Sequence, residues 1–97
     1  MARLDDAALE EALGTLPDWS RDGEVLTRTV RCANWRAAVS LVDAVAEDAD
    51  RRNHHPDLCI TGYRNVSFRL QTHSEGGITP LDLDLAKRID ELAAGEG

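Results

Sequence analysis

The sequence predicts a single α+β domain in which helices pack on one face of an antiparallel four-stranded sheet. Its 97 residues suffice for one domain with one modest core. Segments with helical spacing of apolar residues alternate with segments of strand-like alternation. The resulting order is helix, hairpin, helix, hairpin, helix, in which short turns join antiparallel strands. One sheet face or edge would remain for solvent or a partner chain, so we expect a homodimer or homotetramer.

The composition is that of a folded protein, with 42% hydrophobic and 30% charged residues. The formal net charge of -7 disfavours binding to nucleic acid and to anionic membranes. No apolar run approaches the roughly 18 residues that a membrane span requires, and the acidic amino terminus is unlike a signal peptide. We therefore expect a cytoplasmic protein.

The amino-terminal third predicts a helix followed by a hairpin. Residues 5 to 14 form the expected helix, which Gly14 and Pro17 end. Asp22-Gly23 lies between two segments of high β-propensity and predicts the hairpin turn. The apolar positions of the helical segment are Leu4, Ala8, Leu9, Ala12, Leu13 and Leu16.

The main helix is expected over residues 35 to 52, with Asn34 as its N-cap. Pro56 disfavours helical geometry at His55 and should end the helix there. Arg51 and Arg52 lie in the last turn, where positive charge complements the helix dipole. The predicted apolar stripe is Trp35, Ala38, Val39, Val42, Val45, Ala46 and Ala49.

A second hairpin follows, with its turn between Gly62 and Asn65 and with His73 on the strand face opposite the core. The residues expected to face the core are Val66, Phe68, Leu70 and Thr72. A flexible loop should precede the final helix, which Thr79 caps and Asp82 back-caps. This helix should run to about residue 93 with Leu81, Leu85, Ile89 and Leu92 as its stripe.

The remaining tryptophans and cysteines are expected to be structural. Trp19 and Trp35 each begin an element and are interpreted as core or interface anchors. Cys32 and Cys59 lack a metal-binding spacing, so burial as thiols is expected, and their pairing is left open.

The chemistry-bearing candidates are the three histidines, His54, His55 and His73, which all fall at element ends. Histidine is the residue type whose ordinary pKa lies near neutral pH. Helix capping is one interpretation, and an open three-histidine metal site is another, but adjacent histidines in extended chain point to opposite sides. An acid-base site without metal fits better, because Asp50 precedes His54 by one helical turn and could orient or charge an imidazole.

The pattern Asp50-x-x-x-His54-His55-Pro56, followed by Tyr63, His73 and Asp82, resembles the pterin-4a-carbinolamine dehydratase family. The resemblance covers residues 35 to 93 and fits the length and order of elements. The spacing from the proline to the aromatic residue is one residue longer than is common in the family. A longer spacing would turn Tyr63 to the other strand face unless a bulge near Gly62 absorbed it.

The resemblance implies a dehydratase without cofactor or metal that removes water from 4a-hydroxytetrahydropterin, giving quinonoid dihydropterin in tetrahydropterin recycling. It assigns acid-base catalysis to His54 and His73 and ring binding to His55, with Tyr63 as a further substrate-binding residue. Asp50 would orient or charge a histidine, and Asp82 would line the pocket rim. An aromatic amino acid hydroxylase would be a partner in the same pathway.

Two other functions stay open. Members of the family also serve as dimerisation partners of a transcription factor, so the chain could be a non-catalytic pterin-binding or coactivator-like module. A pterin-related fold could also have acquired another task. The presence of all three histidines favours the enzyme.

Overall fold

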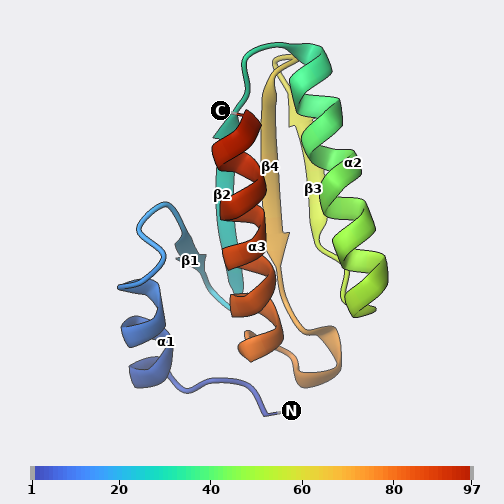
Figure 1. Cartoon of the computed structure of the whole chain (residues 1–97). Helices are drawn as coiled ribbons and strands as arrows, with labels where there is room; N and C mark the ends of the chain where they lie inside the picture. The colour runs from blue at the N-terminus through green and yellow to red at the C-terminus, as the bar shows by residue number, and fades with distance from the viewer. Residues whose placement is uncertain (1, 97) are drawn as a thin grey trace.

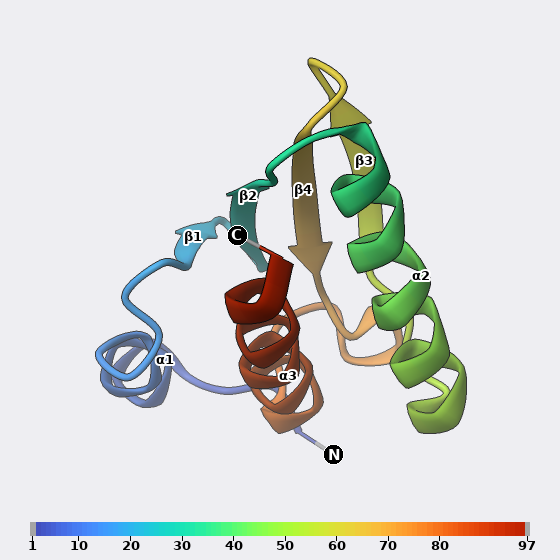
Figure 2. The same cartoon turned by 45° about the horizontal axis from the view of Figure 1, so that its top comes forward.

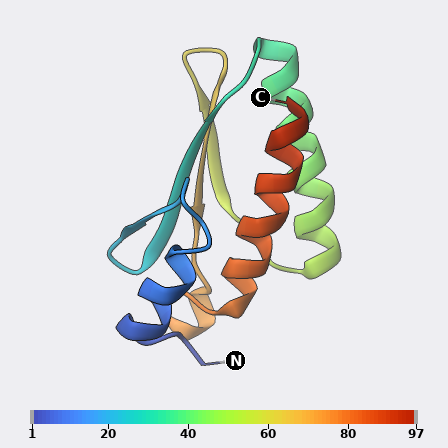
Figure 3. The same ribbon diagram turned by 60° about the vertical axis from the view of Figure 1, so that its left-hand side comes forward.

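The computed structural model describes residues 2–96, in which a four-stranded antiparallel sheet carries two long helices on one face (Figure 1). The turned view separates the two layers (Figure 3). The predicted order of helices and hairpins is confirmed. The elements are α1 (Asp6–Leu13), β1 (Ser20–Asp22), β2 (Val25–Arg31), α2 (Trp35–Arg52), β3 (Asp57–Thr61), β4 (Asn65–Leu70), the 3-10 turn η1 (His73–Glu75) and α3 (Pro80–Glu96).

The sheet has the strand order β1-β2-β4-β3, so the two hairpins join through β2 and β4. Leu26 pairs with Leu70 and Val30 with Val66, which sets apolar side chains of both strands on the helix-covered face. The alternate positions of β2, β3 and β4 form the open face. The alternation predicted for these strands therefore holds.

Side-chain caps fix where the first two helices begin. Asp5 accepts a hydrogen bond from the Ala8 N–H at 2.8 Å, and Asn34 accepts one from the Ala37 N–H at 2.9 Å. Each bond satisfies an amide that has no partner within the helix. The α1 helix lies at the β1 end of the sheet, with α3 between it and α2 (Figure 2).

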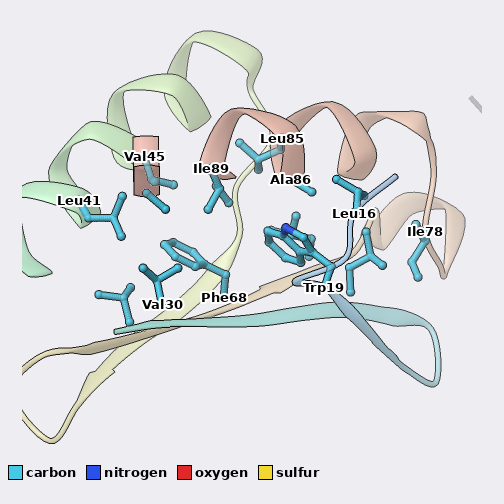
Figure 4. Packing of buried hydrophobic residues seen from close by; sticks show 14 of the residues in the cluster. Leu16, Trp19, Val30, Leu41, Val45, Phe68, Ile78, Leu85, Ala86 and Ile89 are labelled. Carbon is cyan, nitrogen blue, oxygen red and sulfur yellow. The ribbon is translucent and has the colours of Figure 1, made fainter. Parts of the chain in front are cut away.

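The core fills the space between the sheet and the two long helices (Figure 4). Phe68 of β4 is fully buried there, and Trp19 closes the end near α1 at 5% exposure. The other buried apolar residues are Leu9, Leu16, Leu26, Val30, Cys32, Ala38, Leu41, Val45, Ala49, Val66, Leu70, Ile78, Leu85, Ala86, Ile89 and Ala93.

The predicted stripe of α2 was partly wrong. The face of α2 that meets the core runs through Leu41 and Val45, whereas Trp35 is 54% and Val39 39% exposed. Positions 35, 39, 42 and 46 form a separate row about a quarter turn around the helix. The sequence alone could not select between the two rows, because both are apolar.

Two further predictions of burial are wrong. Leu81 is 37% exposed, because the buried face of α3 is centred between Ile89 and Ala93, about a quarter turn away. Cys59 is exposed while Cys32 is buried, and the structure joins neither in a disulfide. Cys59 lies on the open face of β3, where alternation places it opposite to Leu58 and Ile60.

Candidate functional site

The α2–β3 corner brings His54 against the start of α3. Asn53 ends α2 in the left-handed conformation, with φ of 50°, and the His54 N–H then bonds back to the Ala49 carbonyl at 3.1 Å. This closing geometry is a common way to end a helix, and asparagine tolerates it. The helix therefore ends at Arg52, the bound that the sequence predicts, three residues before His55.

His54 forms a short hydrogen bond with a buried carboxylate. Its Nε2 lies 2.6 Å from Asp82 Oδ1, and the Asp82 side chain is completely buried while that of His54 is 11% exposed. Asp82 was expected at the rim of a pocket, and its side chain is completely buried in contact with His54. The sequence predicted Asp50, one helical turn before His54, as the carboxylate that orients this histidine. The carboxylate that binds His54 comes instead from another helix, α3.

The second oxygen of Asp82 is held by the capping residues of α3. Oδ2 accepts from the Thr79 N–H at 2.9 Å and from the Thr72 hydroxyl at 2.8 Å. The Thr72 and Thr79 hydroxyls lie 2.7 Å apart, and Thr79 Oγ1 accepts the Leu81 N–H at 3.2 Å. The predicted cap is confirmed, and the same carboxylate that caps α3 orients His54.

This network determines which atom of each hydrogen-bonded pair is the donor. Because Thr72 donates to Asp82, the Thr79 hydroxyl must donate to Thr72. An ionised carboxylate only accepts, so the Nε2 of His54 carries a proton toward Asp82. In the neutral imidazole, Nδ1 is then the nitrogen with a lone pair.

Asp50, which the sequence predicted as a partner of His54, binds His55 instead. The His55 Nε2 lies 2.9 Å from Asp50 Oδ1, and both side chains are well exposed. Adjacent histidines thus bind two different aspartates, as expected when neighbouring residues point to opposite sides.

His73 was predicted on a strand, but β4 ends at Leu70 and His73 begins the turn η1. The segment after β4 is tightly closed, because the Thr72 N–H bonds to the Gly77 carbonyl at 2.9 Å. Gly77 and Ile78 are buried, which differs from the flexible loop expected here. His73 is exposed and follows Thr72, a ligand of Asp82, so it lies at the same end of the molecule as His54.

Tyr63 lies at the other end. It occupies the turn between β3 and β4, while His54 precedes β3 and His73 follows β4 (Figure 1). Gly62 and Tyr63 both have positive φ, 54° and 56°, and β3 pairs with β4 without a bulge. The longer spacing therefore lengthens the turn and leaves the strand register regular. Tyr63 is 60% exposed, and its ring centroid lies 5.9 Å from the Arg64 guanidinium carbon.

Sequence reasoning missed a buried carboxylate on α2. Asp48 was not singled out from the sequence, yet its side chain is only 7% exposed and it binds Arg88 of α3 at 2.9 Å and Arg51 at 2.8 Å. Burial alone would raise the pKa of Asp48, but the hydrogen bonds and charges of Arg88 and Arg51 outweigh it and lower that pKa. Arg51 thus neutralises Asp48 in addition to its expected place near the helix end.

Hollows on the open sheet face lie apart from the histidines. One of about 570 Å³ is lined by Thr27, Thr29, Ser67 and Arg69 among others, and a smaller one lies beside Cys59. No histidine lines either hollow. Within residues 2–96, no three His, Cys, Asp or Glu side chains are arranged to hold a metal ion. In the same residues, no helix is long and apolar enough to cross a membrane.

Comparison with known proteins assigns the chain to a family. The family model described as pterin 4 alpha carbinolamine dehydratase matches residues 2–92. This chain belongs to the pterin-4a-carbinolamine dehydratase family. The resemblance predicted from the histidine motif is therefore confirmed.

Relatives of similar length support the assignment. A Nocardia farcinica protein named "putative pterin-4-alpha-carbinolamine dehydratase" is 52% identical over 93% of this chain and 94% of its own. A protein of the same name from Thermomicrobium roseum is 46% identical over 97% of this chain and all of its own. Both matches span nearly the full length of the two chains, so the family covers the whole domain.

Solved structures agree with the fold. The crystal structure of a transcriptional coactivator/pterin dehydratase from Brucella melitensis is 31% identical, with a TM-score of 0.89 over 94% of this chain and 98% of that one. A pterin dehydratase-like protein identified as a RuBisCO assembly factor in the alpha-carboxysome has a TM-score of 0.67 over 82% of this chain and 93% of that one, at 22% identity. At that identity the second likeness shows the fold alone.

Proposed function

We propose that this family member is a 4a-hydroxytetrahydropterin dehydratase that acts by histidine acid-base catalysis in tetrahydropterin recycling. The observation that carries the proposal is the buried Asp82 carboxylate at 2.6 Å from His54. A completely buried, fully hydrogen-bonded carboxylate that also caps a helix holds the imidazole in one orientation and one tautomer. A histidine that served only to cap α2 would not need such a support.

The reaction needs two proton transfers. The 4a-hydroxyl leaves as water after a proton reaches its oxygen, and the N5 proton departs as the C4a=N5 double bond forms. His54 can offer or take a proton at Nδ1, because Nε2 is committed to Asp82. His73 is the exposed second group at the same end and is proposed as the other member of the pair.

His55 is proposed as a ligand of the pterin ring, oriented by Asp50. Their hydrogen bond of 2.9 Å is solvent-exposed, so it positions the imidazole ring of His55 weakly. A binding role tolerates this exposure better than a role that requires a fixed proton. Cytoplasmic location, the hydroxylase of the same pathway and a homo-oligomeric state belong to the same proposal.

Stopped-flow ultraviolet spectroscopy of freshly generated 4a-hydroxytetrahydropterin tests the activity. The native chain should accelerate loss of the carbinolamine, and His73→Ala should be slower by roughly 100- to 10,000-fold, the usual contribution of a general acid-base group. Ser74→Ala, an exposed neighbour in η1, should retain the native rate. Equal rates with and without the native chain, together with binding of a pterin analogue, would contradict the dehydratase proposal and favour a pterin-binding module.

A further inference from the structure

His73 has the weakest side-chain support of the three histidines. His54 and His55 each bind a carboxylate, whereas within residues 2–96 no side chain binds the imidazole of His73. His73 opens the single turn η1, and its side chain is exposed. A side chain that no neighbour orients takes its position from the backbone that carries it. The contacts that hold this turn therefore limit where the imidazole can lie.

Two glycines close the segment that carries His73. The Gly76 N–H donates to the His73 carbonyl at 3.2 Å, and Gly76 has a positive φ of 66°. Glycine adopts this conformation without strain. The Thr72 N–H donates to the Gly77 carbonyl at 2.9 Å, which joins the two flanks of the turn. The backbone of Gly76 and Gly77 thus helps to set the orientation of η1.

The amino-terminal segment lies directly against these glycines (Figure 3). The Leu4 N–H donates to the Ile78 carbonyl at 2.8 Å, and Arg3 Nη1 donates to the Gly76 carbonyl at 3.2 Å. Both bonds join residues from opposite ends of the sequence. Arg3 therefore binds the carbonyl of the same residue whose N–H closes the turn at His73.

A series of alternating charges connects Arg3 to the first hairpin. Glu24 Oε2 lies 3.5 Å from Arg3 Nη1, and Glu24 Oε1 lies 3.6 Å from Arg21 Nη2. Arg21 also binds Asp6 of α1 at 2.9 Å. Positive and negative groups alternate along this series, so neighbouring charges attract one another. Glu24 lies between β1 and β2, so the series ties Arg3 to the turn of that hairpin.

Arg3 and Glu24 pack so closely against Gly77 that no side chain fits there. A Cβ built at Gly77 would lie 2.8 Å from Glu24 Oε2 and 3.1 Å from Arg3 Cδ. Both distances are shorter than the roughly 3.5 to 4.0 Å of favourable carbon contacts. Gly77 has no positive φ, so its lack of a side chain serves the close approach of Arg3 and Glu24.

We propose that Arg3 is a positioning residue for His73: paired with Glu24, it binds the Gly76 carbonyl and so holds the turn that carries the imidazole. The Arg3 and Glu24 side chains are 53% and 42% exposed, and ion pairs this exposed stabilise a fold weakly. Loss of Arg3 should therefore loosen the turn and leave the fold intact. The hold on the turn stands on these contacts, whereas its effect on the reaction rests on the proposed function.

Amide hydrogen exchange measured by NMR tests the hold on the turn without reference to activity. Arg3→Met removes the donors and the charge, so the Gly76 amide should exchange roughly 2- to 10-fold faster, the range expected for one hydrogen bond. The amides of β4 should keep their native rates, which separates local loosening from unfolding. Arg36→Met, an exposed arginine at the start of α2, is the matched control and should leave Gly76 unchanged. Native exchange at Gly76 in Arg3→Met would overturn the proposal.

Gly77→Ala tests the same contact from the other side. The added methyl group would displace the flexible side chains of Arg3 and Glu24, so Gly76 exchange should rise by a similar factor. Because both substitutions break one contact, the double variant Arg3→Met/Gly77→Ala should exchange about as fast as either single variant. Effects that multiply in the double variant would show two independent contacts and overturn the role of Arg3.

Steady-state kinetics of the dehydration test the effect on catalysis. Arg3→Met should lower kcat by about the same factor as it raises Gly76 exchange, and it should leave KM unchanged because His55, the proposed ring ligand, is untouched. Faster exchange with a native kcat would overturn the positioning role. A native chain without dehydratase activity would contradict the proposed function instead, and the exchange results would still decide whether Arg3 holds the turn.

Discussion

At the scale of the residue, Asp82 combines two tasks. One oxygen caps α3 through the Thr79 N–H, and the other holds His54. A residue that begins a helix is fixed by the backbone, so the imidazole inherits that rigidity. The capping pattern was visible in the sequence, but the contact of this cap with His54 was not, because His54 lies 28 positions earlier.

Asp82→Asn should reverse the tautomer of His54 with little loss of stability. The amide oxygen must stay toward the Thr79 and Thr72 donors, so the NH₂ group faces His54 and forces its proton onto Nδ1. We expect the dehydration rate to fall by roughly 100- to 10,000-fold, and the free energy of unfolding to change by about 1 kcal/mol.

Imidazole ¹⁵N shifts measured by NMR would report the tautomer directly. Asp84→Asn, an exposed position of the same helix, is the matched control and should change neither the shifts nor the rate. An unchanged His54 tautomer in Asp82→Asn would contradict the orienting role.

At the scale of the element, α2 and α3 are joined by a buried carboxylate. Asp48 of α2 binds Arg88 of α3 and Arg51 of its own last turn. Its lowered pKa in the folded chain means that it stabilises the fold above its ordinary pKa, and that this contribution is lost as the pH falls through the folded value. The two helices should therefore separate more readily in acid.

Arg88→Met should lower the urea midpoint of unfolding more at pH 7 than in acid, and the difference should shrink as the pH falls below the ordinary pKa of the Asp48 carboxyl. The variant removes the largest hydrogen bond that lowers the pKa of Asp48, so the difference from the native chain shrinks once Asp48 is protonated. Lys87→Met, the exposed neighbour on α3, should show no such pH dependence. A difference equal at both pH values would show that Arg88 contributes only by packing its aliphatic stem.

At the scale of the whole molecule, one two-layer core supports all the elements that carry the candidate residues. Phe68 lies at its centre, and β4 connects the Tyr63 turn to the segment that carries Thr72 and His73. Loss of the core would therefore remove the histidine site together with the fold.

Phe68→Ala should lower the free energy of unfolding by about 3 to 5 kcal/mol, because it deletes a fully buried ring and leaves a cavity. Chemical denaturation at pH 7 measures this change. Ser67→Ala, the adjacent residue on the open face, should change stability by roughly 0.5 kcal/mol or less. A similar loss in both variants would place the stabilising core elsewhere.

The sequence by itself determined the spacing of apolar residues in strands and helices, the helix caps and the histidine motif of the family. Alternation in β2 and β4, the caps Asn34 and Thr79, and the family of the chain were all readable, because each depends on local spacing. The three histidines were identified as candidates for the same reason. That His73 would lie at the same end of the molecule as His54 and His55 was expected only because the hairpin between them folds back.

Only the tertiary structure decided which side chains meet. Asp82 rather than Asp50 binds His54, Asp48 is buried against Arg88, and Trp35 faces outward. Each depends on how a helix is rotated against a neighbour distant in sequence, and two apolar or acidic rows on one helix look alike in a linear pattern. The place of Tyr63 likewise follows from the length of a turn and the register of β3 with β4, which are settled only when the sheet forms.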